Sequence, residues 1–303
     1  MAERSARRPL RTAASSGLPR RAWLGGTLGA GLAWAGLARA EPAPGALRLL
    51  SAGGSVTELV YRLGAGGQLV AADSTSLFPA DARRLPKLGY HRTLSAEGLL
   101  ALRADLLLAA ADAGPPNVLA QVESAGLRVL RGVPGHGFEV LQTQIALLAR
   151  ALGREAEGRQ LAAEVEAGRA RLAAAILPAA TAPRVLFVLS HAAGNVQVAG
   201  AGTAAQALIE LAGARNALQG VQGYRPLSAE AAVAAAPDWI LGTTEGLAAL
   251  GGVPALLARP GLALTPAGRA GRVLAFDALL MLGNGPRLPQ AVEQLARGLG
   301  TLA

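Results

Sequence analysis

The sequence predicts an α/β protein made of two related lobes, each with a parallel β-sheet, that one long helix joins. Three observations predict this architecture. Short apolar segments typical of buried strands alternate with segments of helical periodicity, which is the pattern of a parallel sheet covered on both faces. One helical pattern, at residues 155–176, is much longer than the others. Finally, a segment of the first half of the chain recurs in the second half.

The first half of the chain shows the strand–helix alternation most clearly. Gly53-Gly54 ends the first apolar run, Ser55 is expected to cap the first helix, and Gly64 is expected to end it. Buried strands are expected at 47–52, 69–72, 105–109 and 127–130, and helices at 56–63, 99–102 and 118–125.

The long helix follows a shorter one. Gly153 separates the two helical patterns, and Pro178 ends the second. Along the longer pattern, apolar residues recur at helical spacing on one side while Glu and Arg occupy the others. The expected elements are helices at 138–152 and 155–176, a strand at 184–189, a glycine-containing loop at 192–202 and a helix at 203–211.

An internal repeat indicates that the two lobes are related. Residues 225–238 match residues 92–105 at half of their positions, including a Leu-Ser-Ala-Glu run and the Asp that opens the next strand. Chance matches in an Ala- and Leu-rich chain are the alternative, but Arg, Ser, Glu and Asp in register favour a true repeat. Two lobes form a cleft, which is a usual place for a ligand. The predicted domains are an N-terminal lobe at 41–152, a linker helix at 153–177 and a C-terminal lobe at 178–303.

The first 40 residues have the pattern of an export signal. An Arg-rich region precedes the uncharged segment 22–37, and Ala38-Arg39-Ala40 resembles a signal-peptidase site. A transmembrane anchor is the alternative, but the uncharged segment falls short of the roughly 20 residues that span a bilayer. Arg20-Arg21 resembles a twin-arginine signal. We therefore expect a cleaved leader at 1–40 and an exported protein.

Composition excludes several classes of function. With 51% hydrophobic and 16% charged residues, the chain is too apolar to be disordered. Much of its net charge of +9 comes from the seven Arg of the leader, so we expect no nucleic-acid partner. The chain has no Cys and only three His, and it lacks phosphate-binding loops and hydrolase motifs. It is not expected to be an enzyme.

Several segments carry a family resemblance: Ser55-Val-Thr-Glu-Leu-Val-Tyr61, Asp73-Ser-Thr-Ser76, and Leu88-Gly-Tyr-His-Arg-Thr-Leu-Ser-Ala-Glu-Gly98. They resemble the periplasmic haem-binding proteins, the substrate-binding components of bacterial haem-uptake ABC transporters. The resemblance implies two Rossmann-like lobes, as in class III periplasmic binding proteins. It also implies haem as the transported ligand, an ABC permease as the partner, and the periplasm as the location. A cobalamin or ferric-siderophore carrier of the same fold is the alternative, but it would lack the Gly-Tyr-x-Arg-x-Leu-Ser-Ala-Glu run.

The resemblance assigns Tyr90 as the axial ligand of ferric haem. A phenolate oxygen is a suitable ligand for oxidised haem iron. Because a free phenol ionises only near pH 10, iron and a nearby cation must favour the phenolate. Arg92 lies two residues further on and can face the same way as Tyr90 in an extended loop. The adjacent His91 would then point the other way, as a bystander at the rim of the site. His136 is expected in a solvent-facing turn.

The second lobe offers three further candidates for haem binding. His191 follows the first strand of that lobe, where it is either a second iron ligand opposite Tyr90 or a locally bonded loop residue. Arg225 aligns with Arg92 in the repeat, and Tyr224 aligns with His91. Stacking on the porphyrin or donating to a propionate is expected for Tyr224 and Arg225, with a surface position as the alternative.

Glu97 and Glu230 occupy the same place in the two repeats. By resemblance, each docks onto arginines of the membrane permease, since two separated charges fix the orientation of a complex. Each would also stabilise the first turn of a helix through its dipole. We expect the protein to be a monomer.

Overall fold

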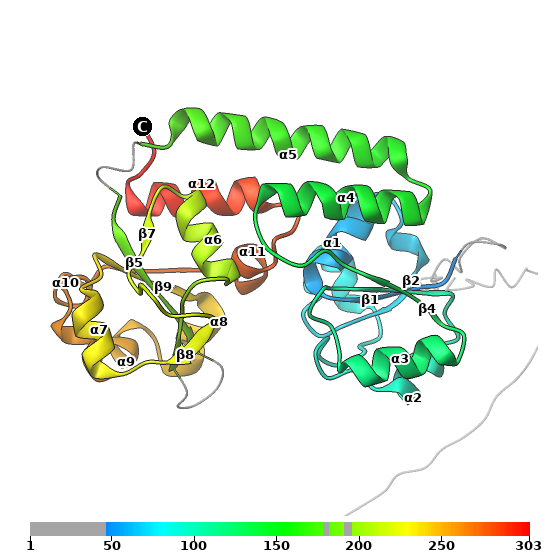
Figure 1. The fold of residues 1–303 in the computed structure, drawn as a ribbon, viewed down its shortest axis with the longest axis horizontal. Helices are drawn as coiled ribbons and strands as arrows, with labels where there is room; N and C mark the ends of the chain where they lie inside the picture. Colours follow the sequence, from blue (N-terminus) through cyan, green and yellow to red (C-terminus); the bar gives the residue numbers. More distant parts are fainter. Residues whose placement is uncertain (1–46, 178–181, 191–195) are drawn as a thin grey trace, which may run out of the picture. The chain divides into compact units, whose positions relative to one another are not determined.

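The computed structural model describes residues 47–177, 182–190 and 196–303, which lie within one compact unit, Glu41–Ala303. The predicted leader and His191 lie outside the described residues. No helix in the described ranges is both long and apolar enough to cross a membrane. The fold is α/β with two sheets, as predicted (Figure 1).

The first sheet is fully parallel, with strand order β2-β1-β3-β4. Its inner strands are completely buried because alternate side chains enter two separate apolar cores. Leu49 and Leu108 face α1 and α4, whereas Leu50 and Leu107 face α2 and α3. The elements are β1 (Leu49–Ala52), β2 (Leu69–Ala72), β3 (Leu106–Ala109), β4 (Arg128–Arg131), α1 (Gly54–Arg62), α2 (Ala96–Leu100) and α3 (Pro116–Ser124).

The first helix begins two residues earlier than the sequence suggested, so the expected Ser55 cap is wrong. Gly53 is the N-cap residue, with a φ of 130° and no capping side chain. A Cβ on Gly53 would lie 2.7 Å from Cβ of Ala110, which follows β3. The close approach of these two strand ends therefore requires glycine.

The second sheet is mixed, which corrects the expectation of a second parallel sheet. Its order is β10-β9-β5-β6-β8, with β7 also paired to β5. Strand β6 lies inside the expected loop 192–202 and runs antiparallel to both β5 and β8. Only five residues separate β5 from β6, too few for the crossover that parallel pairing needs. The strands are β5 (Arg184–Ser190), β6 (Val196–Ala199), β7 (Arg215–Asn216), β8 (Tyr224–Pro226), β9 (Trp239–Thr243) and β10 (Val273–Phe276).

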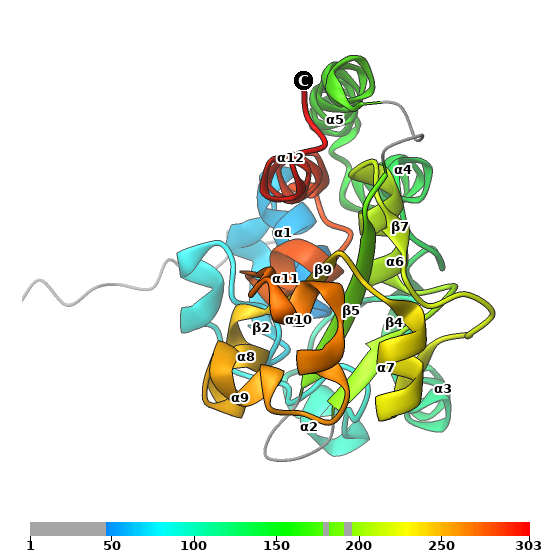
Figure 2. The ribbon, with the colours of Figure 1, turned by 90° about the vertical axis from the view of Figure 1, so that its left-hand side faces the viewer.

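The long helix α5 packs along α4 and α12, as both views show (Figures 1 and 2). It buries Leu161, Val165 and Leu172 and leaves its charged faces exposed. The remaining α-helices are α4 (Phe138–Leu152), α5 (Glu155–Ala175), α6 (Ala204–Leu211), α7 (Ala229–Ala235), α8 (Thr244–Leu250), α9 (Val253–Leu257), α10 (Pro266–Arg269), α11 (Ala278–Leu282) and α12 (Leu288–Leu299). Short 3₁₀ helices lie at Gly66–Gln68, Ala80–Arg84 and Leu262–Leu264.

The sequence repeat has the same structural role in both sheets. Asp105 accepts a hydrogen bond from the backbone N–H of Arg48 at 2.7 Å, and Asp238 accepts one from the backbone N–H of Arg184 at 2.8 Å. Each Asp thereby ties the start of one strand to the start of its neighbour, β3 to β1 and β9 to β5. The repeat in the sequence therefore corresponds to a repeat in the structure.

The segment before α12 attaches the second half of the chain to the first sheet. Arg287 donates from Nε and an amino group to the two carboxylate oxygens of Glu58 on α1, at 2.6 and 2.9 Å. Its guanidinium also lies over the ring of Phe78, 3.9 Å from the ring centroid. The backbone N–H of Gly137 donates to Asn284 at 2.7 Å. Contacts therefore link the two halves in addition to α5, while the domain limits at 41–152, 153–177 and 178–303 stay a prediction.

Candidate functional site

Tyr90 lies in the loop that leaves the carboxyl end of β2. The loop folds back along the strand because Leu88 N–H donates to the carbonyl of Ala72, and Ser74 N–H donates to the carbonyl of Gly89. Gly89 has a φ of 85°, a left-handed conformation that favours glycine. The Tyr90 side chain that follows is 39% exposed. A large aromatic residue is thus presented at the carboxyl end of a parallel sheet, the usual ligand-binding edge.

Arg92 and Asp112 hold a cationic donor on the Tyr90 hydroxyl. An amino group of Arg92 donates to the Tyr90 oxygen at 2.9 Å, and Nε donates to Asp112 at 2.9 Å. The other amino group also pairs with Asp112. Partial burial acts to lower the pKa of Arg92, but its hydrogen bonds and charge interaction with Asp112 raise it overall. The guanidinium therefore stays charged beside the phenol oxygen.

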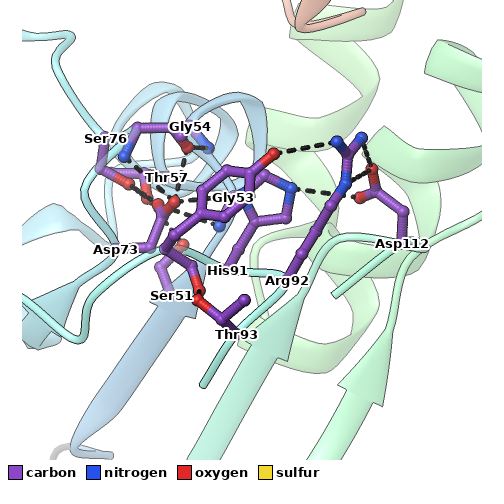
Figure 3. A network of polar contacts seen from close by, with 12 residues as sticks. Ser51, Gly53, Gly54, Thr57, Asp73, Ser76, His91, Arg92, Thr93 and Asp112 are labelled. Carbon is purple, nitrogen blue, oxygen red and sulfur yellow. Dashed lines mark hydrogen bonds and ion pairs between the residues drawn. The ribbon is translucent and has the colours of Figure 1, made fainter. Parts of the chain in front are cut away.

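His91 is a buried member of the same network, so its expected place as a bystander at the rim is wrong. The residue is 9% exposed, and its Nδ1 lies 3.3 Å from Asp73 while its Nε2 lies 3.4 Å from Asp112 (Figure 3). Burial acts to lower the pKa of His91, but the two carboxylates outweigh it and raise the pKa to about 9. His91 alternates with Tyr90 as expected, but the side of the loop it faces holds two acids that are distant in sequence.

Asp73 anchors this network in the core. Its carboxylate is completely buried and accepts hydrogen bonds from Gly53 N–H at 3.0 Å, from Thr75 N–H and hydroxyl at 3.1 and 2.6 Å, and from the Ser76 hydroxyl at 2.6 Å. Burial raises the pKa of Asp73, but the hydrogen bonds, led by that of His91, lower it to about 2. Sequence reasoning assigned Asp73 no role. The signal was the Asp-Ser-Thr-Ser pattern, typical of a turn closed by the Asp side chain.

Asp112 joins the buried and exposed parts of the network. The hydrogen bond from His91 holds the pKa of Asp112 well below its usual range, against burial and with help from Arg92. Its two carboxylate oxygens have different partners: Oδ1 faces His91, and Oδ2 accepts a hydrogen bond from Arg92. The segment Asp112-Ala-Gly-Pro-Pro116 also resembles the periplasmic haem-binding proteins, but no role was predicted for Asp112 itself from the sequence, because only the fold brings the end of β3 to the Tyr90 loop.

Tyr224 and Arg225 lie on β8, an edge strand of the second sheet, paired with Ala199 and Val198 of β6. Burial raises the pKa of Tyr224, while the charge of Arg92 acts in the opposite direction. Arg225 is exposed. The roles of both residues in ligand binding stay predictions.

Glu97 and Glu230 are both exposed, each at the second position of a helix that a serine caps. Their positions in α2 and α7 are equivalent, and their contact with a permease stays a prediction. His136 is exposed in the loop before α4, and partial burial lowers its pKa. His191, the predicted second ligand, falls outside the described residues.

The described residues contain no cluster of three or more His, Asp or Glu that could hold a metal ion. A groove of about 750 Å³ lies between α5 and α12, but no residue of the Tyr90 network lines it. The predicted haem cleft beside Tyr90 stays a prediction.

Comparison with protein families identifies one matching model, that of the periplasmic binding proteins, over residues 50–279. Among solved structures, the periplasmic heme-binding protein BhuT in complex with two hemes is 48% identical, with a TM-score of 0.79 over 84% of this chain and 98% of that one. The periplasmic heme-binding protein RhuT from Roseiflexus sp. RS-1, in apo form, is 39% identical, with a TM-score of 0.80 over the same shares. HutB of Vibrio cholerae, a periplasmic heme-binding protein, is 36% identical, with a TM-score of 0.74 over 83% of this chain and 98% of that one.

Two curated relatives extend the comparison. An uncharacterized ABC transporter substrate-binding lipoprotein, YvrC of Bacillus subtilis (strain 168), is 25% identical over 81% of this chain and 77% of its own length. The vitamin B12-binding protein of Yersinia pestis (strain Pestoides F) is 35% identical over 95 residues, which are 31% of this chain and 34% of that protein. The chain thus spans about a third of the B12-binding protein.

Proposed function

The chain belongs to the periplasmic binding protein family, and from this premise we propose that it captures ferric haem and delivers it to the permease of an ABC transporter. The observation that carries the proposal is the Tyr90 hydroxyl, held by a charged Arg92 on an exposed loop at the carboxyl end of a parallel sheet. Three similar solved structures, 36–48% identical over most of this chain, are of periplasmic heme-binding proteins.

The chemistry of the Tyr90 network suits an oxidised haem iron. A phenolate is a hard anionic oxygen ligand for ferric haem. The guanidinium of Arg92 places a positive charge and an N–H donor on the oxygen that would bind the iron. Asp112 fixes the guanidinium through paired N–H···O bonds, a geometry that Lys cannot reproduce. Tyr90 supplies the iron ligand, Arg92 donates to the Tyr90 oxygen, and Asp112 holds Arg92 in place.

The second lobe completes the site in this proposal. Tyr224 covers the porphyrin with its ring, and Arg225 pairs with a propionate from its exposed position on β8. For His191, which lies outside the described residues, a second iron ligand and a locally bonded loop residue stay the two alternatives.

The chain acts as a transport component and not as an enzyme. Its leader directs export to the periplasm, and it works as a monomer in the acquisition of iron. Glu97 and Glu230 dock onto positive side chains of the permease, one from each lobe, which would orient the complex. Their exposure and equivalent helix positions support this assignment.

A cobalamin carrier is the second candidate, favoured by the vitamin B12-binding relatives of the same family. Haem fits better for two reasons. The B12-binding match covers 31% of this chain, whereas the heme-binding structures match 83–84% of it. In addition, a tyrosine oxygen paired with a guanidinium is suited to ferric iron.

Titration of the purified mature protein with hemin tests the proposal. We expect saturable binding with a Soret change at a stoichiometric ratio, and binding at least 100-fold weaker in Tyr90→Phe. Tyr61→Phe is the matched control, since Tyr61 lies on α1 against Gly66 and outside the network. Saturable binding of cyanocobalamin without any Soret change from hemin would select the alternative function.

A further inference from the structure

We propose that His91 is a positioning residue for haem binding: it links the buried Asp73 to Asp112 and so fixes Arg92 on the Tyr90 oxygen. The inference rests on the proposed function, because it concerns how the haem ligand is prepared. It goes beyond that function by giving a role to a histidine that does not bind iron. Both ring nitrogens of His91 already face carboxylates, so neither is free for a metal.

The inner end of this link is rigid. The Asp73 carboxylate is completely buried and is held by the backbone of Gly53 and by the side chains of Thr75 and Ser76. Ser76 in turn shares a hydrogen bond of 2.6 Å with Thr57 of α1. The oxygen of Asp73 that faces His91 is therefore fixed by the core of the first lobe.

The outer end would be mobile without His91. The side chains of Arg92 and Asp112 are 56% and 50% exposed, and an exposed ion pair contributes only about 0–1 kcal/mol. Such a pair by itself would not hold the guanidinium at one position over the phenol. His91 is nine-tenths buried, and its Nε2 lies 3.4 Å from Oδ1 of Asp112, the oxygen that does not accept from Arg92. This contact restrains the Asp112 carboxylate on the side opposite Arg92.

The geometry also requires a particular form of the ring. To donate to both Asp73 and Asp112, His91 must carry a proton on each nitrogen. A neutral side chain of similar size offers at most one of the two contacts, so the link depends on histidine.

A purely structural role is the competing explanation, and a double-mutant cycle separates the two. We expect His91→Leu to weaken hemin binding about 10- to 100-fold, the usual effect of losing a residue that orients a metal ligand. In an Arg92→Ala background the same change should weaken binding less than about threefold, since its effect passes through Arg92. Equal losses in both backgrounds, or no loss in the wild-type background, would overturn the proposal.

Two further measurements keep the test decisive. Gln144→Leu is the matched control, because Gln144 is as buried as His91 and lies in the same lobe, but its side chain accepts from the backbone of Val133 and not from the network; we expect its loss of hemin binding to stay below threefold. If His91→Leu does not fold, His91→Gln replaces it, with an intermediate loss expected. In the haem-free protein, the ¹⁵N NMR signal of the Arg92 Nε–H should broaden or shift in the His91 variant but not in Gln144→Leu. An unchanged signal would overturn the positioning role even if haem proved not to be the ligand.

Discussion

The buried ion pair between Arg287 and Glu58 gives a sharp prediction about stability. The Glu58 side chain is 4% exposed, and both of its oxygens accept hydrogen bonds from Arg287. Among the described residues, Glu58 has no other side-chain hydrogen bond. Arg287→Met therefore leaves a buried carboxylate without a partner, and the expected loss in the free energy of unfolding is about 3–5 kcal/mol.

Urea and thermal unfolding of the mature protein measure this loss. For a chain of this size, each kcal/mol lost from the free energy of unfolding lowers the melting temperature by about 2–4 °C. The melting temperature of Arg287→Met should therefore fall by roughly 6–20 °C. The control is Arg62→Met, which breaks the ion pair of Arg62 with Glu164 on α5. Those side chains are 42% and 47% exposed, so we expect a loss below about 1 kcal/mol.

The double variant Glu58→Met/Arg287→Met tests the cause of the loss. Replacing both partners removes the buried charge, so the double variant should lose at least about 2 kcal/mol less than the sum of the single losses. Strict additivity would show that the single losses come from packing. It would refute the attribution of the loss to an uncompensated charge.

Three further predictions concern pH, the internal repeat and the permease. The charged form of His91, with its pKa raised to about 9, stabilises the fold fully below pH 6.5, and this stabilisation is lost as the pH rises through 9. The ionised form of Asp73, with its pKa lowered to about 2, stabilises the fold fully above pH 4, and this stabilisation is lost as the pH falls toward 2. Urea unfolding between pH 3 and 10 should show both declines. His91→Leu should remove the alkaline decline and weaken the acid one, because the hydrogen bond of His91 leads those that lower the pKa of Asp73. Asp105→Ala and Asp238→Ala should each cost about 1 kcal/mol, since each frees the backbone N–H of a strand; clearly unequal losses would argue against equivalent roles. Reversing the charges of both Glu97 and Glu230 should leave hemin binding unchanged and slow haem uptake into permease-containing liposomes at least tenfold, and normal uptake would exclude docking through these residues.

Local patterns in the sequence predicted most of the fold. The strands of the first sheet lie within two residues of the expected ranges, and α4 and α5 match to within one residue. These elements carry their own signal, because buried strands are continuous apolar runs and the helices keep a regular apolar spacing. Strand β6 was missed because Val196–Ala199 is short and was assigned to a loop, although the five residues before it contain a glycine and are typical of a hairpin connection.

Sequence patterns did not predict contacts between residues that are far apart in the chain. Arg287 and Glu58 are separated by 229 positions, and neither belongs to a repeating motif. The network at Tyr90 was partly visible, because Arg92 is close enough in sequence for its direction to follow from alternation. His91 was misjudged because its partners, Asp73 and Asp112, reach it only when β2 and β3 lie in the same sheet.

Resonance Raman spectroscopy of the haem-loaded protein shows whether Tyr90 binds the iron, since it detects the bond between iron and a phenolate oxygen. We expect phenolate vibrations that shift when the protein is made with ring-deuterated tyrosine. These vibrations should persist in Tyr61→Phe and disappear in Tyr90→Phe. The same vibrations in Tyr90→Phe, or none in the wild-type complex, would contradict the assignment of Tyr90 as the ligand of ferric haem.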